Sequence, residues 1–174
     1  MSSIPVSGIL CPVKQTAKQL SLYLETSVWN FVYAEDAPEK QKSTLEFFEE
    51  VKLGFYRIFI SDLVLAEIRN APEPKREKLE ALIRHYRPTC LETKSDVETL
   101  AGAYLKAKIV SERFSPDVLH AAYATAYDVD GLVSWNLEHL VRLKTRLAIQ
   151  GINRQLGYKE IEIVTPEEVI GYGV

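Results

Sequence analysis

One stretch of the chain, residues 115–139, constrains the fold more than any other. It reads SPDVLHAAYATAYDVDGLVSWNLEH. Ser115 and Pro116 are typical of a helix start, and apolar residues then recur at helical spacing for about three turns. Residues 128–131 predict a turn, and residues 132–134 predict a short buried strand. The stretch therefore predicts a helix, a turn and a strand in that order.

The lengths of this helix and strand predict where two polar residues lie. A helix of about eleven residues rises about 16 Å, and about five extended residues cover a similar length. The strand runs back alongside the helix, so we expect Asp117 and Asn136 to lie at the same edge of a sheet. Ligands of open α/β sheets bind outside the carboxyl ends of the strands, and this is that edge.

The rest of the chain alternates between strand and helix patterns. Strands are predicted at residues 21–24, 57–60, 88–92 and 160–164. Helices are predicted through residues 30–33, with Thr26 or Ser27 as the cap, and at residues 37–53, 61–71, 75–86, 95–110 and 137–150. Ser61 is the expected cap of the third of these helices, and residues 95–98 and 165–168 each fit a capping box. Helices between strands predict a three-layer α/β/α sandwich with a mostly parallel central sheet. Residues 1–20 show no pattern and are expected to form a tail or extension, whereas residues 21–174 are expected to form one domain.

Composition and motifs exclude several classes of protein. Apolar residues make up 47% of the chain and no apolar run approaches the roughly twenty residues that span a bilayer, so no membrane association is expected. Cys11 and Cys90 lack metal-ligand spacing, and residues 1–10 lack the features of a secretory signal. A cytoplasmic protein with reduced thiols is expected. The sequence contains no motif of zinc hydrolases, serine hydrolases, P-loop enzymes or dinucleotide-binding proteins.

Three acids stand in apolar surroundings. Glu25 ends the first strand, Glu67 interrupts the apolar run LVLAEI, and Asp117 opens the central helix. Carboxylates that share a pocket raise each other's pKa unless a cation neutralises them. Carboxylate oxygens and water are the ligands that Mg²⁺ and Mn²⁺ prefer. Such a metal site suits cleavage of phosphodiester bonds.

Each of these residues also has an ordinary structural interpretation. Glu25 is then an acid at a strand end, Glu67 a solvated helix position, and Asp117 a first-turn acid that the helix dipole favours. His120, one turn after Asp117, is a metal ligand, a base or, as we favour, a partly buried polar residue. The spacing alone leaves these alternatives open.

A basic segment follows the central stretch. Residues 141–159 hold five basic residues and no acid. Such a segment is most often a solvated helix face. It also fits an electrostatic track for a phosphate backbone, because it follows Asn136 directly. The residues expected to contact such a backbone are Arg142, Lys144 and Arg146.

Three segments, in this order, resemble the PIN-domain family and especially its VapC-like toxins of bacterial and archaeal toxin–antitoxin systems. LYLETS resembles the opening strand with its acid, ISDLVLAEI the second block, and SPDVLHAAYATAYDVDGLVSWNLEHL the third and fourth blocks. The likeness continues through IEIVTPEEV and covers roughly residues 20–170. It implies an α/β/α sandwich with a parallel sheet and a metal-dependent endoribonuclease that cleaves single-stranded RNA with Mg²⁺ or Mn²⁺.

The resemblance also implies roles for individual residues. Glu25, Glu67 and Asp117 would hold the metal and its water. Asn136 would be a supporting ligand, with Thr26 and Ser134 in supporting positions. Two positions depart from the usual acidic quartet, because Glu25 stands where Asp is commoner and Asn136 brings no charge. Three charges instead of four should weaken a second metal more than the first.

The expected function is therefore that of the toxin of a type II toxin–antitoxin pair, with RNA as substrate and a cognate antitoxin as partner. A homodimer is also expected, since Phe47, Phe48 and Tyr86 offer apolar surface unless they lie in the core. The alternative is a PIN-like module that binds RNA or a protein without cutting. A generic α/β ligand-binding domain is the third possibility, but no motif supports it.

Overall fold

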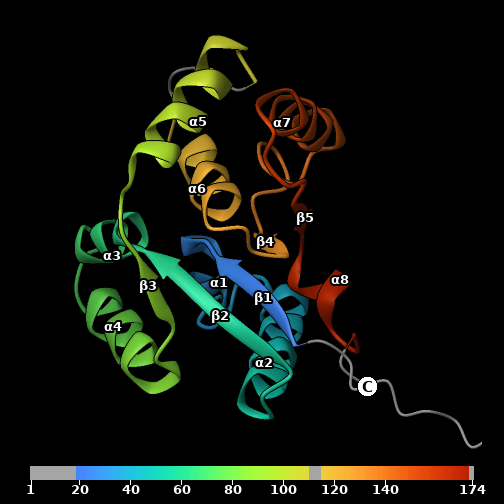
Figure 1. Cartoon of the computed structure of the whole chain (residues 1–174). Helices are drawn as coiled ribbons and strands as arrows, with labels where there is room; N and C mark the ends of the chain where they lie inside the picture. Colours follow the sequence, from blue (N-terminus) through green and yellow to red (C-terminus); the bar gives the residue numbers. More distant parts are fainter. Residues whose placement is uncertain (1–18, 110–114, 173–174) are drawn as a thin grey trace, which may run out of the picture.

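The computed structural model describes residues 19–109 and 115–172, so most of the expected tail lies outside the described residues. The strands are β1 (Leu20–Leu24), β2 (Tyr56–Ser61), β3 (Thr89–Leu91), β4 (Gly131–Val133) and β5 (Glu162–Val164) (Figure 1). The helices are α1 (Thr26–Phe31), α2 (Pro38–Lys52), α3 (Asp62–Arg69), α4 (Lys75–Tyr86), α5 (Ser95–Lys106), α6 (Ser115–Ala126), α7 (Leu143–Leu156) and α8 (Pro166–Val169).

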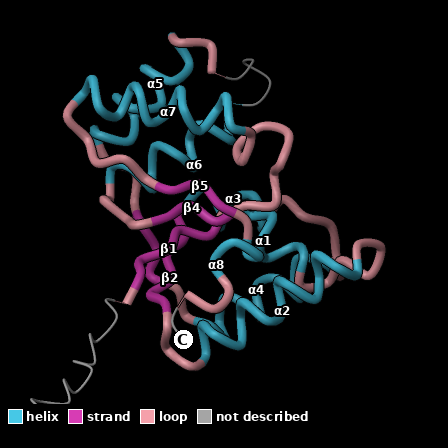
Figure 2. The backbone as a smooth tube through the Cα atoms, turned by 90° about the vertical axis from the view of Figure 1, so that its right-hand side faces the viewer, coloured by secondary structure: helices cyan, strands magenta, loops and turns pink. Residues whose placement is uncertain are grey.

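The five strands form one sheet in which every described pairing is parallel. Their order is β3-β2-β1-β4-β5, with β1 in the centre. Helices α5, α6 and α7 pack together on one side of the sheet, and α1, α2, α4 and α8 lie on the other (Figure 2). The expected α/β/α sandwich with a mostly parallel sheet is therefore confirmed. Among the described residues, no helix is both long and apolar enough to cross a membrane.

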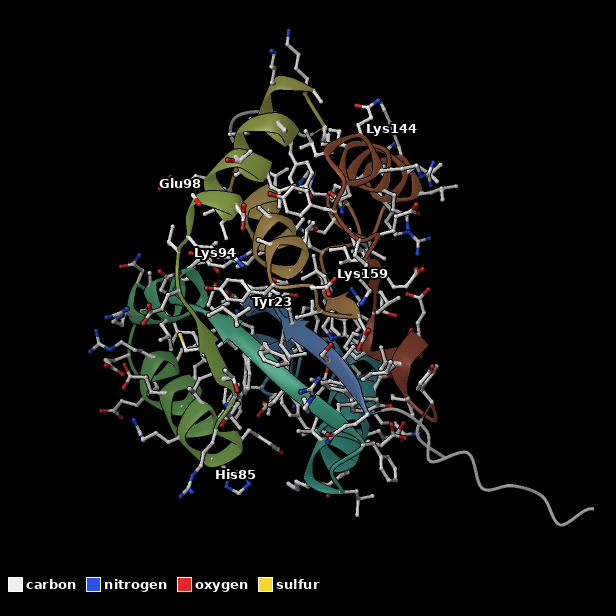
Figure 3. All side chains as sticks on the ribbon, viewed as in Figure 1. Tyr23, His85, Lys94, Glu98, Lys144 and Lys159 are labelled. Carbon is white, nitrogen blue, oxygen red and sulfur yellow. The ribbon has the colours of Figure 1, made fainter. Side chains whose placement is uncertain are left out.

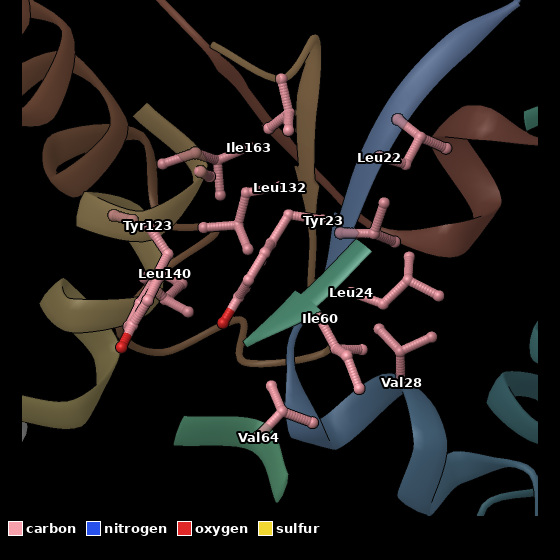
Figure 4. Packing of buried hydrophobic residues seen from close by; sticks show 14 of the residues in the cluster. Leu22, Tyr23, Leu24, Val28, Ile60, Val64, Tyr123, Leu132, Leu140 and Ile163 are labelled. Carbon is pink, nitrogen blue, oxygen red and sulfur yellow. The ribbon is translucent and has the colours of Figure 1, made fainter. Parts of the chain in front are cut away.

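The central strand is buried on both faces. Leu22, Tyr23 and Leu24 are at most 2% exposed, as expected for a strand between two helical layers, which reads as a continuous apolar run. Tyr23 points toward the layer that holds α6 (Figures 3 and 4). Phe47 and Phe48 are 0% and 1% exposed on the other side. These two rings are core residues, so they do not provide the surface on which the expected homodimer was based.

The structure corrects the boundaries of the basic helix. The helix expected at residues 137–150 is α7, which begins at Leu143. The chain instead turns directly after Asn136, whose carbonyl oxygen accepts hydrogen bonds from the amides of Leu140 and Val141. The helix ends at Gly157, which adopts a φ of 78° and so gives the left-handed cap that glycine favours.

The helix caps agree only in part with the sequence predictions. Ser61 caps α3 by accepting a hydrogen bond from Val64 N, and Thr165 and Glu168 form the expected capping box of α8. The capping box expected at Ser95 is wrong, because Lys94 is the N-cap of α5 and makes no side-chain cap bond. The expected end of that helix, near residue 110, lies outside the described residues.

The carboxylate of Asp130 links the amino ends of β1, β4 and β5. Asp130 Oδ2, just before β4, accepts hydrogen bonds from the backbone amide (2.9 Å) and hydroxyl (2.7 Å) of Ser21, the second residue of β1. Lys159, just before β5, contacts Asp130 Oδ1 at 2.9 Å. Burial raises the pKa of Asp130, but these contacts together hold it well below its usual range.

We predict that Asp130→Asn lowers the free energy of unfolding by about 1–3 kcal/mol at pH 7, because hydrogen bonds to a charged group are lost. The lowered pKa of Asp130 means that its stabilisation is present above the unfolded pKa of about 3.9 and is lost as pH falls through the folded pKa. Urea unfolding of parent and variant at pH 7 and pH 3 measures this. The difference should shrink at pH 3, and the exposed Asp128→Asn should change little at either pH.

Candidate active site

The four predicted site residues lie around the carboxyl ends of the central strands. Glu25 directly follows β1, and Asn136 follows β4. Asp117 lies in the first turn of α6, and Glu67 lies in α3, which begins where β2 ends. The structure brings Asp117 and Asn136 into direct contact, since Asn136 Nδ2 donates a hydrogen bond to Asp117 Oδ1 at 3.0 Å.

Glu25 caps the helix that follows it. Its Oε2 accepts a hydrogen bond from the amide of Ser27 at 2.9 Å, and its Oε1 accepts one from the Ser27 hydroxyl. The expected cap at Thr26 or Ser27 is wrong, because Glu25 is the N-cap, and α1 begins one or two residues earlier than expected. Ser27 Oγ also accepts the amide of Trp135 at 2.8 Å. Glu25 and the segment after β4 are therefore linked through one serine.

Glu67 is half-buried and held from two sides. Its Oε2 accepts a hydrogen bond from the Thr26 hydroxyl and lies 3.3 Å from His120 Nε2. Burial raises the pKa of Glu67, but the contacts with His120 and Thr26 lower it by more. The pKa of Glu67 therefore lies below its usual value. Glu67 is therefore a carboxylate at neutral pH.

Asp117 has one oxygen without a hydrogen bond. Oδ1 accepts the bond from Asn136, whereas Oδ2 is buried and has no hydrogen-bond partner among the described residues. Burial is the main reason that the pKa of Asp117 is raised, and the charge of Glu25 adds to it, although His139, His120 and Asn136 oppose it. A buried carboxylate oxygen without a donor is unfavourable unless another group satisfies it.

Asn136 is fixed by its own loop. The backbone amide of Asn136 donates a hydrogen bond to Ser134 Oγ at 2.9 Å. Its side-chain Oδ1 accepts a hydrogen bond from the backbone amide of His139 at 3.1 Å. Ser134 is fully buried. Because Oδ1 is engaged by a backbone donor, the NH₂ group is the part of Asn136 that faces Asp117. Asn136 and Ser134 thus orient the acid.

The donor chemistry of the site fits a hard divalent cation. Oxygens of Glu25, Glu67 and Asp117 are the type of ligand that Mg²⁺ and Mn²⁺ take, and Asp117 Oδ2 is a buried one that lacks a hydrogen-bond partner among the described residues. In residues 19–109 and 115–172, however, no group of three or more His, Cys, Asp or Glu side chains is arranged to hold a metal. Both oxygens of Glu25 accept hydrogen bonds from Ser27, and each keeps a second lone pair.

The comparisons with known proteins show the fold. The sequence matches no protein-family model and no curated protein sequence. The structure matches a chain of VapBC2 from Rickettsia felis bound to a promoter DNA fragment, with a TM-score of 0.56, 15% identity, and coverage of 84% of this chain and 98% of that chain. It also matches DNA-bound VapBC from Salmonella typhimurium, with a TM-score of 0.55, 19% identity and the same coverage. The chain therefore has the PIN-like fold of these structures.

The sequence patterns do not predict the roles of two residues near the site acids. Ser27 holds Glu25 and Trp135, and Tyr23 lies 2.8 Å from His120, which in turn contacts Glu67. The sequence predicts only that Tyr23 belongs to the buried first strand. Its hydroxyl, at a position that leucine would also fill, is the only sign of a polar role.

The raised pKa of Asp117 predicts a pH dependence of stability without metal. Ionising Asp117 is harder in the folded state than in the unfolded state, so its charge destabilises the fold above the folded pKa and has no effect below about pH 4. We predict that Asp117→Asn becomes more stable relative to the parent as pH rises from 3 to 7. Urea unfolding in EDTA measures the difference in the free energy of unfolding between parent and variant. A difference that does not change with pH would contradict the raised pKa of Asp117.

Proposed function

We propose that this chain is a Mg²⁺- or Mn²⁺-dependent endoribonuclease that cleaves single-stranded RNA, as the toxin of a type II toxin–antitoxin pair in the cytoplasm. The observation that carries this proposal is the buried Asp117 oxygen without a hydrogen-bond partner, beside Asn136. A divalent cation is the group that satisfies such an oxygen and also gives phosphodiester chemistry. The likeness of the fold to VapBC structures supports this choice over other metal-dependent reactions.

Each residue has a role in this proposal. Asp117, Glu67 and Glu25 hold the cation, which when bound activates water and stabilises the charge on the leaving oxygen. Thr26 holds Glu67 in place through its hydroxyl. Asn136 orients Asp117, and Ser134 orients Asn136, through the hydrogen bonds described above.

The start of α7 supplies positive charge near the site for the RNA backbone. Arg142 and Lys144 are exposed and follow Asn136 closely in the chain, and Lys144 projects outward from α7 (Figure 3). Arg146 is partly engaged elsewhere, because its Nη1 donates to the carbonyl of Ile163 at 3.2 Å. We therefore assign phosphate contacts to Arg142 and Lys144, and leave Arg146 a secondary part.

The proposed partner is an antitoxin protein. The two matched structures are VapBC complexes. Leu137, Leu143 and Leu147 are 46%, 61% and 59% exposed around the start of α7, and large apolar side chains in one exposed region are typical of a protein interface. Basic residues flank them, so a partner segment that combines apolar and acidic side chains fits this region. The homodimer stays a prediction.

A catalytically weakened module is the second candidate. The observations that favour it are the Ser27 contacts that engage both oxygens of Glu25 and the absence of a charge at Asn136. In that case the fold binds RNA without cutting it.

We predict that Mn²⁺ raises the melting temperature of the parent, because a ligand that binds only the folded state stabilises it. Asp117→Asn should lose this rise and lose RNA cleavage while remaining folded, since asparagine keeps the size of aspartate but not its charge. Thermal unfolding with and without Mn²⁺, and cleavage of a labelled single strand, measure both effects. Asp128→Asn, beyond the opposite end of β4, is the matched control. Cleavage by purified Asp117→Asn at the parental rate would remove the basis of the proposal.

We also predict that Arg142→Ala with Lys144→Ala weakens RNA binding and lowers the salt dependence. Each lost phosphate contact should reduce the slope of log K against log salt by about 0.7 for a single strand. The Mn²⁺ effect on melting should be unchanged. Arg154→Ala is the control, since Arg154 lies at the other end of α7 and pairs with Glu160. An unchanged salt slope in the double variant would show that RNA follows another path.

A further inference from the structure

A buried chain of hydrogen bonds leads from the centre of the sheet to Glu67. The hydroxyl of Tyr23 lies 2.7 Å from Ser61 Oγ and 2.8 Å from His120 Nδ1. His120 Nε2 lies 3.3 Å from Glu67 Oε2. Tyr23 and Ser61 are fully buried and His120 is 2% exposed. The chain of bonds therefore joins β1, the end of β2 and α6 away from solvent, and ends at the half-buried Glu67 of α3.

The direction of these bonds follows from the groups at the two ends. Glu67 is a carboxylate and can only accept, so His120 Nε2 must donate to it. In a neutral imidazole Nδ1 is then an acceptor, and the Tyr23 hydroxyl must donate to it. Burial raises the pKa of Tyr23 well above its usual value, so this proton is present.

The remaining bond completes one consistent arrangement. Because Tyr23 donates to His120, its oxygen accepts the proton of the Ser61 hydroxyl, and Ser61 Oγ accepts the amide of Val64 at 3.5 Å.

The position of His120 relates this chain of bonds to the proposed metal. His120 lies one helical turn after Asp117, on the same helix α6. Its contact with Glu67 therefore links the helix that carries one acid to the helix that carries another. Groups that hold a metal ligand from behind fix its orientation and its basicity.

We propose that Tyr23 and His120 are positioning residues that hold the Glu67 carboxylate in place for a divalent cation, with His120 Nε2 as the hydrogen-bond donor to Glu67. The inference rests on the proposed function, because it requires Glu67 to be a metal ligand. The inference explains why the Tyr23 hydroxyl and the His120 imidazole lie in an otherwise apolar core. Loss of such a supporting group typically weakens metal binding about 10- to 100-fold.

The first test removes only the Tyr23 hydroxyl. We expect Tyr23→Phe to weaken Mn²⁺ binding in calorimetric titration by about tenfold or more. Tyr104→Phe is the matched control, because Tyr104 is equally buried and its hydroxyl bonds to Asn153 and Thr125, away from the site acids. Both variants lose a buried hydroxyl, so only a role toward Glu67 separates their Mn²⁺ affinities. Equal affinities in the two variants and the parent would overturn the proposal.

The second test reads the tautomer without metal. Nitrogen NMR of the His120 side chain in the parent should show a proton on Nε2, and Tyr23→Phe should shift the Nδ1 signal. An Nε2 without a proton in the parent would overturn the arrangement. His120→Gln, which keeps a donor for Glu67, should retain more Mn²⁺ affinity than His120→Leu, and the reverse order would contradict the role of Nε2.

The failures of the two proposals differ. A parent that binds no Mn²⁺ contradicts the proposed function, and with it the role of Tyr23 and His120 toward a metal, whatever the tautomer. A parent that binds Mn²⁺ and cuts RNA, but whose affinity is unchanged by Tyr23→Phe, contradicts only the positioning role.

Discussion

Burial of the Asp117 carboxylate is the constraint on which the arrangement of the site depends. The carboxyl ends of β1, β2 and β4 lie at one edge of the parallel sheet. Glu25, Glu67 and Asn136 follow these strands, and Asp117 lies beside Asn136 in the first turn of α6. Asn136 donates to one oxygen of Asp117, and the other oxygen has no donor among the described residues. A charge in such a place raises the free energy of the folded state unless a cation compensates it. The proposed metal would compensate the buried charge of Asp117.

The other two acids show how the protein satisfies carboxylates when only its own donors are present. Glu25 folds back onto Ser27, two residues further along the chain, and Glu67 is held by Thr26 and His120. Glu25 is therefore held by the helix that it caps, whereas Glu67 is held by residues of two other helices.

The sequence was sufficient for the layers and the general place of the site, because both follow from local patterns. The apolar run Leu22–Leu24 predicted a short buried strand. The helix, turn and strand lengths predicted that Asp117 and Asn136 lie at the same edge of the sheet, where they are in direct contact. The start of α7 was misplaced because apolar residues continue through residues 137–142, where the backbone turns on the Asn136 carbonyl. The Tyr23 and His120 contact joins residues 97 apart in the chain, so only the packed structure reveals it.

The most direct test of the central claim is the position of a bound cation. A crystal structure of the parent grown with Mn²⁺, with anomalous scattering measured at a wavelength where manganese scatters strongly, locates the ion without reference to activity. The account predicts one anomalous peak within about 2.5 Å of Asp117 Oδ2, with an oxygen of Glu67 in the same coordination sphere. Crystals that hold Mn²⁺ only elsewhere, with Asp117 Oδ2 bonded to a protein donor or to water alone, would contradict it.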